Sequence, residues 1–266
     1  MLMMTRTLCA LTLVFSLAAC GDDGGSATAD AANNSADASA PDATTTTRTD
    51  VTFTVAGTDT LTGYLTTSAA SPAQAPGVLL LHQFMQTDEQ WGELPDILAR
   101  RGYRVLAFNL RGHGDSAAYP GGPLSGILSD PVTAPADVDA ALAYLSTTGD
   151  ADSARIAVIG TSIGANLTVA AAVRGLAKTY VSLSARKSAV EIFAGQTATG
   201  MSSVLYFASE LDSGGTQAAD AQTMHDATTT PRGVQVYSAI ADHGISILRN
   251  QANSTTMITD WLDAQL

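Results

Sequence analysis

The sequence predicts an α/β domain whose core is a mostly parallel sheet of eight strands. Two short segments in which apolar residues alternate with polar or small ones are followed by six runs that are almost entirely apolar or β-branched. Runs of the second kind are typical of parallel strands that are buried on both faces. Segments with helical spacing of apolar residues lie between these runs, and this alternation of strands and helices predicts a parallel sheet.

The predicted elements follow one another regularly along the chain. Residues 51–56 and 61–65 alternate around Gly57-Thr58-Asp59 and predict an antiparallel hairpin with one face in water. Helices are predicted at residues 91–101, 135–145 and 163–176, where apolar residues recur three or four positions apart. The buried strands are predicted at residues 77–81, 104–110, 155–160, 179–184, 203–209 and 233–239.

The first residues have the pattern of an export signal. Residues 1–19 place Arg6 ahead of an apolar run that is too short to span a membrane and is followed by small residues. The segment Leu17-Ala18-Ala19-Cys20 resembles the lipobox of bacterial lipoproteins. This resemblance implies that Cys20 carries lipid and anchors the protein in the bacterial cell envelope, at the outer membrane or cell surface. Ordinary signal cleavage, which would leave Cys20 as a free thiol, is the alternative.

Residues 20–48 are predicted to form a flexible stalk and residues 49–266 a single folded domain. From Gly21 to Arg48 the chain contains no Val, Leu, Ile or aromatic residue, so this segment cannot bury enough apolar surface to offset the entropy of ordering. The whole chain has a formal net charge of -12, only 13 Lys and Arg residues and no basic cluster. These properties argue against a nucleic-acid partner and against binding to anionic lipid headgroups.

The segment VIGTSIGANL carries Gly160, Ser162 and Gly164 in the spacing G-x-S-x-G, where a predicted buried strand ends and a helix begins. This is the context of a nucleophile elbow, a strained turn that presents a serine hydroxyl at the carboxyl end of a parallel sheet. The two glycines are expected because side chains at these positions would collide with neighbouring backbone. Ser162 is therefore the candidate nucleophile.

A serine hydroxyl needs a base within hydrogen-bond reach. Of the 4 histidines, His243 follows the last predicted strand and is the candidate base. His82 follows the third strand and is expected to shape the adjoining loop. His113 lies after the fourth strand, and His225 is expected to be an exposed histidine of a helix.

The base in turn needs a carboxylate to orient it. Asp212 follows the seventh predicted strand, which places it beside the loop of His243, and Glu210 is the alternative. Asp242 adjoins the histidine in sequence and is expected to point elsewhere. Asp220 and Asp226 fall in a predicted helix, where solvated side chains are expected.

The oxyanion of an acyl-transfer intermediate needs two backbone N–H donors. One is expected from Ile163, the residue after the candidate nucleophile, and the other from the loop LLLHQFMQ after the third strand. Phe84 is the candidate in that loop and Gln83 the alternative.

The segments LLLHQF, NLRGHGDS, GTSIGA, ASELD and DHG, in this order, resemble the α/β-hydrolase family from about residue 51 to the end. The resemblance implies a three-layer fold with helices on both faces of the sheet. Family members commonly have His-Gly where this chain has His82-Gln83. The connection from Ser184 to Met201 leaves no room for a helical cap, so the chain is similar to the compact, dienelactone-hydrolase-like group, whose namesake has a cysteine nucleophile.

The resemblance implies a serine hydrolase that cleaves carboxylic esters of small or medium acyl groups through an acyl-enzyme, without cofactor or metal. A shallow pocket for the small-molecule ester is expected at Phe84, Met85, Ile163 and Phe193. Two alternatives remain open. One is a surface binding lipoprotein that has kept the fold and lost catalysis, and the other is a peptidase or thioesterase with the same triad.

Overall fold

The computed structural model describes residues 45–266 except residues 56 and 70. The predicted signal peptide, Cys20 and most of the predicted stalk lie outside these residues. Within the described residues no helix is both long enough and apolar enough to cross a membrane.

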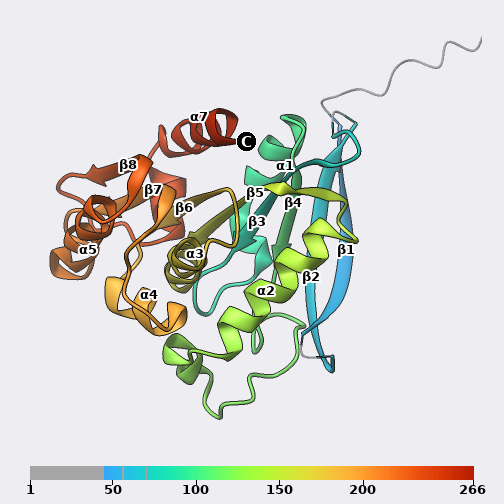
Figure 1. The fold of residues 1–266 in the computed structure, drawn as a ribbon, viewed down its shortest axis with the longest axis horizontal. Helices are drawn as coiled ribbons and strands as arrows, with labels where there is room; N and C mark the ends of the chain where they lie inside the picture. Colours follow the sequence, from blue (N-terminus) through green and yellow to red (C-terminus); the bar gives the residue numbers. More distant parts are fainter. Residues whose placement is uncertain (1–44, 56, 70) are drawn as a thin grey trace, which may run out of the picture. The chain divides into compact units, whose positions relative to one another are not determined.

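The described residues form one sheet in the order β1-β2-β4-β3-β5-β6-β7-β8 (Figure 1). Strand β2 is antiparallel to both of its neighbours, and all other neighbouring strands are parallel. The predicted parallel sheet with an N-terminal antiparallel hairpin is therefore confirmed. The strands are β1 Thr46–Val55, β2 Asp59–Ser68, β3 Ala75–Leu81, β4 Arg104–Phe108, β5 Ala151–Thr161, β6 Thr179–Leu183, β7 Ser202–Ser209 and β8 Thr229–Tyr237.

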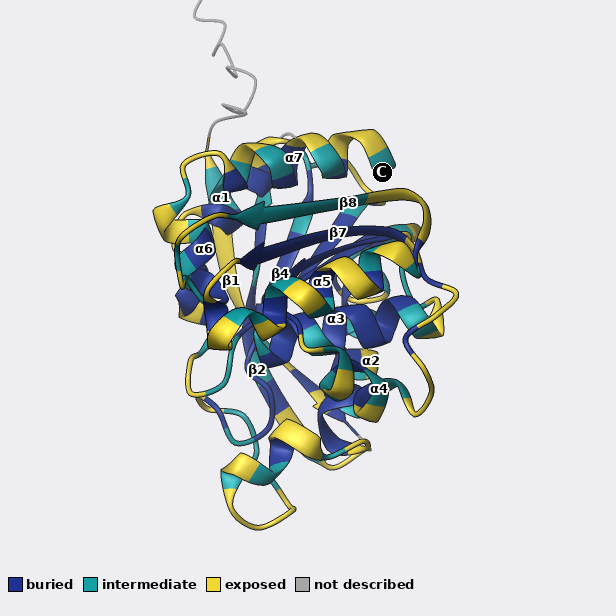
Figure 2. Ribbon diagram, turned by 90° about the vertical axis from the view of Figure 1, so that its left-hand side faces the viewer, coloured by how far each residue is buried: buried dark blue, intermediate teal, exposed yellow. Residues whose placement is uncertain are grey.

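Helices cover both faces of the sheet (Figure 2). Helices α2, α3, α4 and α5 pack over one face, and α1, α6 and α7 over the other. The predicted three-layer arrangement is thus present. The helices are α1 Leu94–Arg100, α2 Thr133–Ser146, α3 Ile163–Arg174, α4 Lys187–Ala194, α5 Thr216–Asp226, α6 Ile245–Asn250 and α7 Ser254–Gln265, with 3₁₀ turns η1 Asp88–Trp91, η2 Leu124–Ser129 and η3 Asp212–Gly215.

Strand β3 shows why the central strands are continuous apolar runs. Successive side chains of a strand point to opposite faces of the sheet. Leu79 and Leu81 belong to the core beneath α2–α5, whereas Val78 and Leu80 belong to the core beneath α1, α6 and α7. All four side chains are fully buried, because both faces of this strand are covered.

Most element boundaries differ from the prediction by a few residues, and two of the differences concern the start of the folded domain and the first helix. Strand β1 begins at Thr46, so residues 46–48 lie in the sheet and not in the stalk; Arg48 is held there by an ion pair with Glu89 and by the ring of Tyr64, 3.5 Å away. The helix predicted at 91–101 is shorter than expected: Trp91 ends the 3₁₀ turn η1, and α1 begins only at Leu94, because Gly92 has φ 56° and ψ -123° and lies outside helical geometry.

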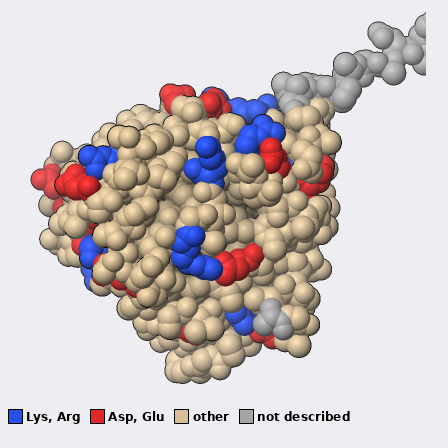
Figure 3. Space-filling view, viewed as in Figure 1, with Lys and Arg blue, Asp and Glu red and all other residues tan. Residues whose placement is uncertain are grey.

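Charged groups are sparse on the face shown in Figure 3, and cationic and anionic atoms there lie mostly next to one another. Among the pairs in the described part of the chain, Arg174 contacts Asp139 across α3 and α2 at 2.8 Å, and Lys187 contacts Glu191 within α4 at 2.5 Å. This face therefore presents neither an extended basic surface nor an extended acidic one.

Candidate active site

Ser162 occupies a sharp turn between the end of β5 and the start of α3. Its backbone has φ 53° and ψ -113°, a conformation that residues with a side chain rarely adopt. The Ser162 N–H donates to the carbonyl oxygen of Leu183 in β6 at 3.0 Å, which fixes the turn to the neighbouring strand. The residue is only partly buried, so the hydroxyl stands at the carboxyl end of the sheet where it can meet a ligand.

The glycines on either side of Ser162 are required by close backbone contacts. A Cβ atom at Gly160 would lie 2.1 Å from the carbonyl oxygen of Gly164, and a Cβ atom at Gly164 would lie 2.0 Å from that of Leu81. Both distances are shorter than any real carbon contact. The start of α3 is consequently pressed against the end of β3, which brings Ser162 next to the loop that follows β3.

His243 and Asp212 lie beside the Ser162 hydroxyl. His243 Nε2 is 2.8 Å from Ser162 Oγ, and His243 Nδ1 is 2.7 Å from Asp212 Oδ2. A carboxylate accepts a hydrogen bond, so Nδ1 carries the proton and Nε2 is free to accept the hydroxyl proton of Ser162. The Asp212 side chain is 4% exposed and that of His243 is 39% exposed. The carboxylate is thus shielded from water while the imidazole edge remains accessible.

The other carboxylates named from the sequence have different partners. Glu210 Oε2 accepts from the Ala239 N–H at 2.7 Å and so braces the end of β8. Asp242 accepts from the side-chain amides of Asn250 and Gln251, both at 2.8 Å, and points away from the histidine as expected. The structure therefore places Asp212, and not Glu210, against His243.

The structure also shows where the side chains predicted to lie on a helix, those of Asp220, Asp226 and His225, are found. Asp220 and Asp226 lie in α5. His225 is half-buried and not exposed. Its ring lies 3.0 Å from Asp226 Oδ1, and its carbonyl accepts from Arg232 at 2.9 Å. Among the described residues, no hydrogen bond joins Asp220, Asp226 or His225 to Ser162 or His243.

The two backbone N–H groups expected to hold the oxyanion have no acceptor within the described part of the chain. One belongs to Ile163 at the first position of α3, where a helix leaves N–H groups unpaired. The other belongs to Phe84 in the loop after β3. The N–H of Gln83 is engaged, since it donates to Gln90 Oε1 at 3.2 Å. Of the two donors considered in this loop, Phe84 is the one whose N–H has no acceptor among the described residues.

Two buried histidines hold the loop after β3 in place. His82 Nε2 accepts from the Leu110 N–H at 3.0 Å, and its Nδ1 lies 2.9 Å from the Gln83 carbonyl oxygen. His113 Nε2 accepts from the Met85 N–H at 3.2 Å, and the two rings are 4.8 Å apart. Burial lowers the pKa of His82 to about 3 and also lowers the pKa of His113. Both rings are neutral near pH 7, and His82 shapes its loop as the sequence predicted.

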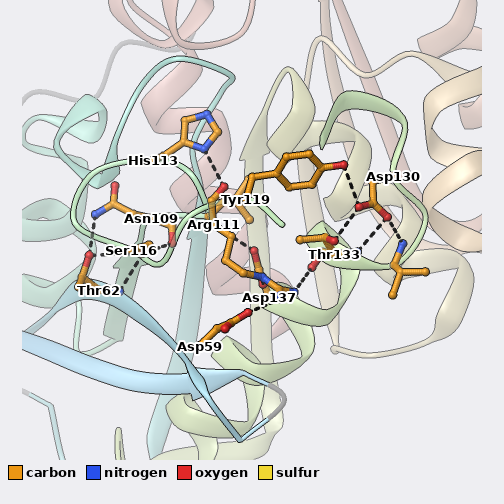
Figure 4. A network of polar contacts seen from close by, with 12 residues as sticks. Asp59, Thr62, Asn109, Arg111, His113, Ser116, Tyr119, Asp130, Thr133 and Asp137 are labelled. Carbon is orange, nitrogen blue, oxygen red and sulfur yellow. Dashed lines mark hydrogen bonds and ion pairs between the residues drawn. The ribbon is translucent and has the colours of Figure 1, made fainter. Parts of the chain in front are cut away.

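The loop after β4 is anchored by a polar network (Figure 4). Arg111 Nε donates to Asp137 Oδ1 in α2 at 2.7 Å, and its other guanidinium nitrogens reach Asp59 Oδ2 and the Thr133 carbonyl oxygen, both at 2.9 Å. Asp137 is fully buried, and burial raises its pKa to about 6 although Arg111 opposes this. The network fixes the loop that carries His113 against the hairpin and α2.

The residues expected to contact substrate are not all together. Phe84 lies half-buried with its ring edge against His113, and the Met85 side chain is 68% exposed. Phe193 does not join them, because it is 3% exposed and lines a cavity of about 310 Å³ with Arg174, at the C-terminal end of α3. That end lies about 18 Å along the helix from Ser162 at the usual 1.5 Å rise per residue.

Several residues that complete this arrangement carried no signal in the sequence. Gln90 Nε2 donates to Thr161 Oγ1 at 2.8 Å, and Ser184 Oγ accepts from the Gly244 N–H at 2.9 Å. Ordinary polar residues of this kind show neither a motif nor a period, so only their tertiary partners reveal them. Among the described residues no group of three or more His, Cys, Asp or Glu side chains is arranged to hold a metal ion.

A family model described as serine aminopeptidase, S33, matches residues 73–185. The matched segment contains Ser162, Ile163 and Phe84 and ends before Asp212 and His243. No curated protein matches the chain.

Similar solved structures include several hydrolases. An acetyl xylan esterase from Paenibacillus sp. R4 is 19% identical, with 83% of this chain and 84% of that chain covered and a TM-score of 0.65. An esterase from Pyrococcus furiosus is 18% identical, with 82% and 91% covered and a TM-score of 0.65. An epoxide hydrolase from Vigna radiata is 14% identical, with 82% and 98% covered and a TM-score of 0.62. At these identities the likeness is one of fold.

Proposed function

We propose that this protein, which has the α/β-hydrolase fold, is a serine hydrolase that cleaves carboxylic esters through an acyl-enzyme intermediate. The observation that carries the proposal is the chain of two short contacts from Ser162 Oγ to His243 Nε2 and from His243 Nδ1 to Asp212. A serine on a strained strand-to-helix turn, a histidine that can accept its proton and a buried carboxylate are the parts that acyl transfer requires. The esterases among the similar structures support the same class of reaction.

The reaction follows from the roles of these atoms. Ser162 Oγ attacks the ester carbonyl carbon while its proton passes to His243 Nε2, and the N–H groups of Phe84 and Ile163 stabilise the negative carbonyl oxygen. The bond to the leaving alcohol then breaks, and the imidazolium returns the proton to the alcohol oxygen. A water molecule next gives its proton to His243 and attacks the acyl carbon. The bond between the acyl carbon and Ser162 Oγ then breaks, His243 returns the proton to that oxygen, and the acid leaves.

The direct test is the substitution Ser162→Ala. We expect it to abolish the hydrolysis of p-nitrophenyl acetate and covalent labelling by a fluorophosphonate, because it removes the oxygen that attacks in the proposed reaction. Ser188→Ala is the matched control, since Ser188 is an exposed serine of α4 and should leave both readouts unchanged. Undiminished hydrolysis by Ser162→Ala would contradict the proposal. A wild-type protein that resists labelling would favour a binding protein without catalysis.

We further propose that the acyl groups are small or medium and that the protein is of the compact, dienelactone-hydrolase-like kind. Between β6 and β7 the chain contains one short helix, α4, and no cap domain that could enclose a long acyl chain. A series of p-nitrophenyl esters from acetate to palmitate tests this. We expect kcat/KM to be highest for the short esters, and a maximum at palmitate would contradict the expectation.

Peptide hydrolysis is a second candidate, favoured by the match to the serine aminopeptidase model. The same serine and histidine would serve, because a triad does not by itself determine the leaving group. Turnover of alanine p-nitroanilide compared with p-nitrophenyl acetate separates the two candidates. Turnover of the anilide that matches that of the ester would favour the peptidase.

From the sequence alone we propose that the protein is a lipoprotein held by lipid on Cys20. Several acyl chains on one residue make a stable anchor, whereas one chain binds only marginally. Mass spectrometry of the mature N-terminus should find a lipidated Cys20, and Cys20→Ser should move the protein out of the membrane fraction. An unmodified Cys20 would contradict the proposal.

A further inference from the structure

Gln83 lies in the loop after β3, at the position where members of the α/β-hydrolase family commonly have glycine. Its side chain makes a contact that glycine could not make. Gln83 Oε1 accepts a hydrogen bond from the Ile245 N–H at 3.1 Å. Ile245 lies two positions after His243, at the first residue of α6. The contact therefore joins the loop that carries the Phe84 N–H group to the loop that carries the histidine.

A second glutamine extends this connection to the nucleophile. Gln90 Oε1 accepts from the Gln83 N–H at 3.2 Å, and Gln90 Nε2 donates to Thr161 Oγ1 at 2.8 Å. Thr161 is the residue immediately before Ser162, and Gln90 is 4% exposed. The carbonyl oxygen of Gln90 accepts from Arg249 in α6 at 2.9 Å. Two glutamines thus tie the loop after β3 both to the strand of the serine and to the segment after the histidine.

The space around Gly244 shows how closely Gln83 approaches the histidine loop. A Cβ atom at Gly244 would lie 2.5 Å from Gln83 Oε1 and 3.5 Å from the Ser162 nitrogen. On its other side Gly244 donates its N–H to Ser184 Oγ at 2.9 Å. The segment that follows His243 is consequently held from two sides, by Ser184 directly after β6 and by Gln83 in the loop after β3.

We propose that Gln83 is a positioning residue that holds His243 in register with Ser162 through the bond from the Ile245 N–H to its side-chain oxygen. This proposal rests on the proposed serine hydrolase function. The His243 side chain is 39% exposed, and its ring is positioned by the backbone of residues 243–245 as well as by Asp212. An amide oxygen suits the task because it is a neutral acceptor, so it anchors the loop without adding charge beside the imidazole.

Two substitutions separate the hydrogen bond from the space that the side chain fills. Gln83→Met keeps the length of the side chain and removes the acceptor. Gln83→Glu keeps an oxygen acceptor and adds a negative charge, which favours the imidazolium form of His243. Gln86→Met is the matched control, because Gln86 is an exposed glutamine of the same loop whose own N–H donates to the Gln83 carbonyl oxygen.

The experiment measures kcat and KM for p-nitrophenyl acetate from pH 5 to 9, the rate of fluorophosphonate labelling, and amide hydrogen exchange at Ile245. For Gln83→Met we expect kcat and labelling to fall about tenfold, with KM nearly unchanged and faster exchange at Ile245, because a misplaced base slows the chemical step more than binding. For Gln83→Glu we expect kcat near that of the wild type on the alkaline plateau and an acid limb moved to higher pH. Gln86→Met should match the wild type.

A side chain that only filled space would leave Gln83→Met with the labelling rate and the Ile245 exchange of the wild type, and that result would overturn the proposal. Wild-type kcat in Gln83→Met would also overturn it. Ser162→Ala belongs in the same series. If its labelling is unchanged, the serine hydrolase function fails; if its labelling is lost while Gln83→Met labels normally, only the positioning role fails.

Discussion

At the scale of single residues, the candidate site depends on backbone conformations that few residues tolerate. Ser162 and Gly244 both lie near φ 55°, with ψ -113° and -116°. Such conformations cost about 1–3 kcal/mol for a residue with a side chain and persist where surrounding contacts hold them. At Ser162 the contact is the bond to Leu183, and at Gly244 it is the bond to Ser184. Gly244 has no side chain and adopts this conformation without that cost, so of these two residues only Ser162 is strained.

Gly244→Ala should therefore impair both activity and stability. The new methyl group would have to displace the Gln83 side chain, since its carbon would lie only 2.5 Å from Gln83 Oε1. We expect a loss of kcat like that of Gln83→Met, together with a loss of about 1–3 kcal/mol in the free energy of unfolding. Gly122→Ala is the control, because Gly122 has φ 93° and nothing within 4 Å. Equal loss of kcat in both variants would contradict this account.

The buried histidines predict how stability depends on pH. In the folded protein the pKa of His82 is lowered to about 3, whereas in the unfolded chain it lies near 6.5. Between these two pKa values His82 is protonated in the unfolded chain and neutral in the folded protein. The free energy of unfolding therefore falls as the pH drops below about 6.5, by up to about 1.4 kcal/mol per pH unit for this group. His113 contributes in the same direction.

Urea unfolding between pH 7 and pH 5 checks this dependence. His82→Gln keeps one donor and one acceptor in the side chain and does not titrate. We expect the variant to lose less stability than the wild type over this range. An identical loss in both proteins would show that His82 does not contribute.

At the scale of elements, a glycine lies near each end of α3, and the two glycines are needed for different physical reasons. Gly164 in the first turn allows the helix to approach β3, while Gly175 ends the helix with φ 67° and ψ 35°. The first glycine is needed for space and the second for conformation. The cost of a methyl group should differ accordingly.

We expect Gly175→Ala to cost about 1 kcal/mol, because only the left-handed conformation is penalised and nothing lies within 4 Å. Gly164→Ala should cost several times more, since its Cβ would overlap the backbone of Leu81. The free energies of unfolding in urea test this order. Equal costs would contradict the close approach of α3 to β3.

At the scale of the whole molecule, the Arg111 network joins parts of the chain that the sheet alone would not hold together. It links Asp59 at the start of β2, the loop after β4 and Asp137 in α2 (Figure 4). Because Asp137 is fully buried, the guanidinium is its main compensating charge. Removing one partner should be costly, and removing both should be less so.

Arg111→Met should therefore lower the free energy of unfolding by about 3–5 kcal/mol, and the double variant with Asp137→Leu should recover part of this loss. Arg174→Met is the control, because Arg174 and Asp139 form a pair with partly exposed side chains. For that variant we expect a loss below about 1 kcal/mol. If both single variants lose the same amount, burial of Asp137 is not what makes the pair important.

Much of the fold could be predicted because strands and helices follow from local patterns of apolar and polar residues. The apolar runs from 77–81 to 233–239 predicted six parallel strands, since a strand buried on both faces must be apolar throughout. The shortening of the helix expected at 91–101 could not be predicted from period alone. Gly92 has non-helical backbone angles, although the apolar residues around it keep the three- or four-residue spacing of a helix.

For this protein, the sequence by itself determined the number and direction of the strands, the strand-to-helix turn at Ser162 and the order in which serine, acid and histidine follow the strands. These features depend on local periodicity and on glycines at fixed spacing. Only the tertiary structure decided that Asp212 and not Glu210 meets His243, that the N–H of Gln83 is already engaged, and that its side chain reaches Ile245. Hydrogen bonds between loops far apart in the chain depend on differences of a few tenths of an ångström, which no pattern of residue types encodes.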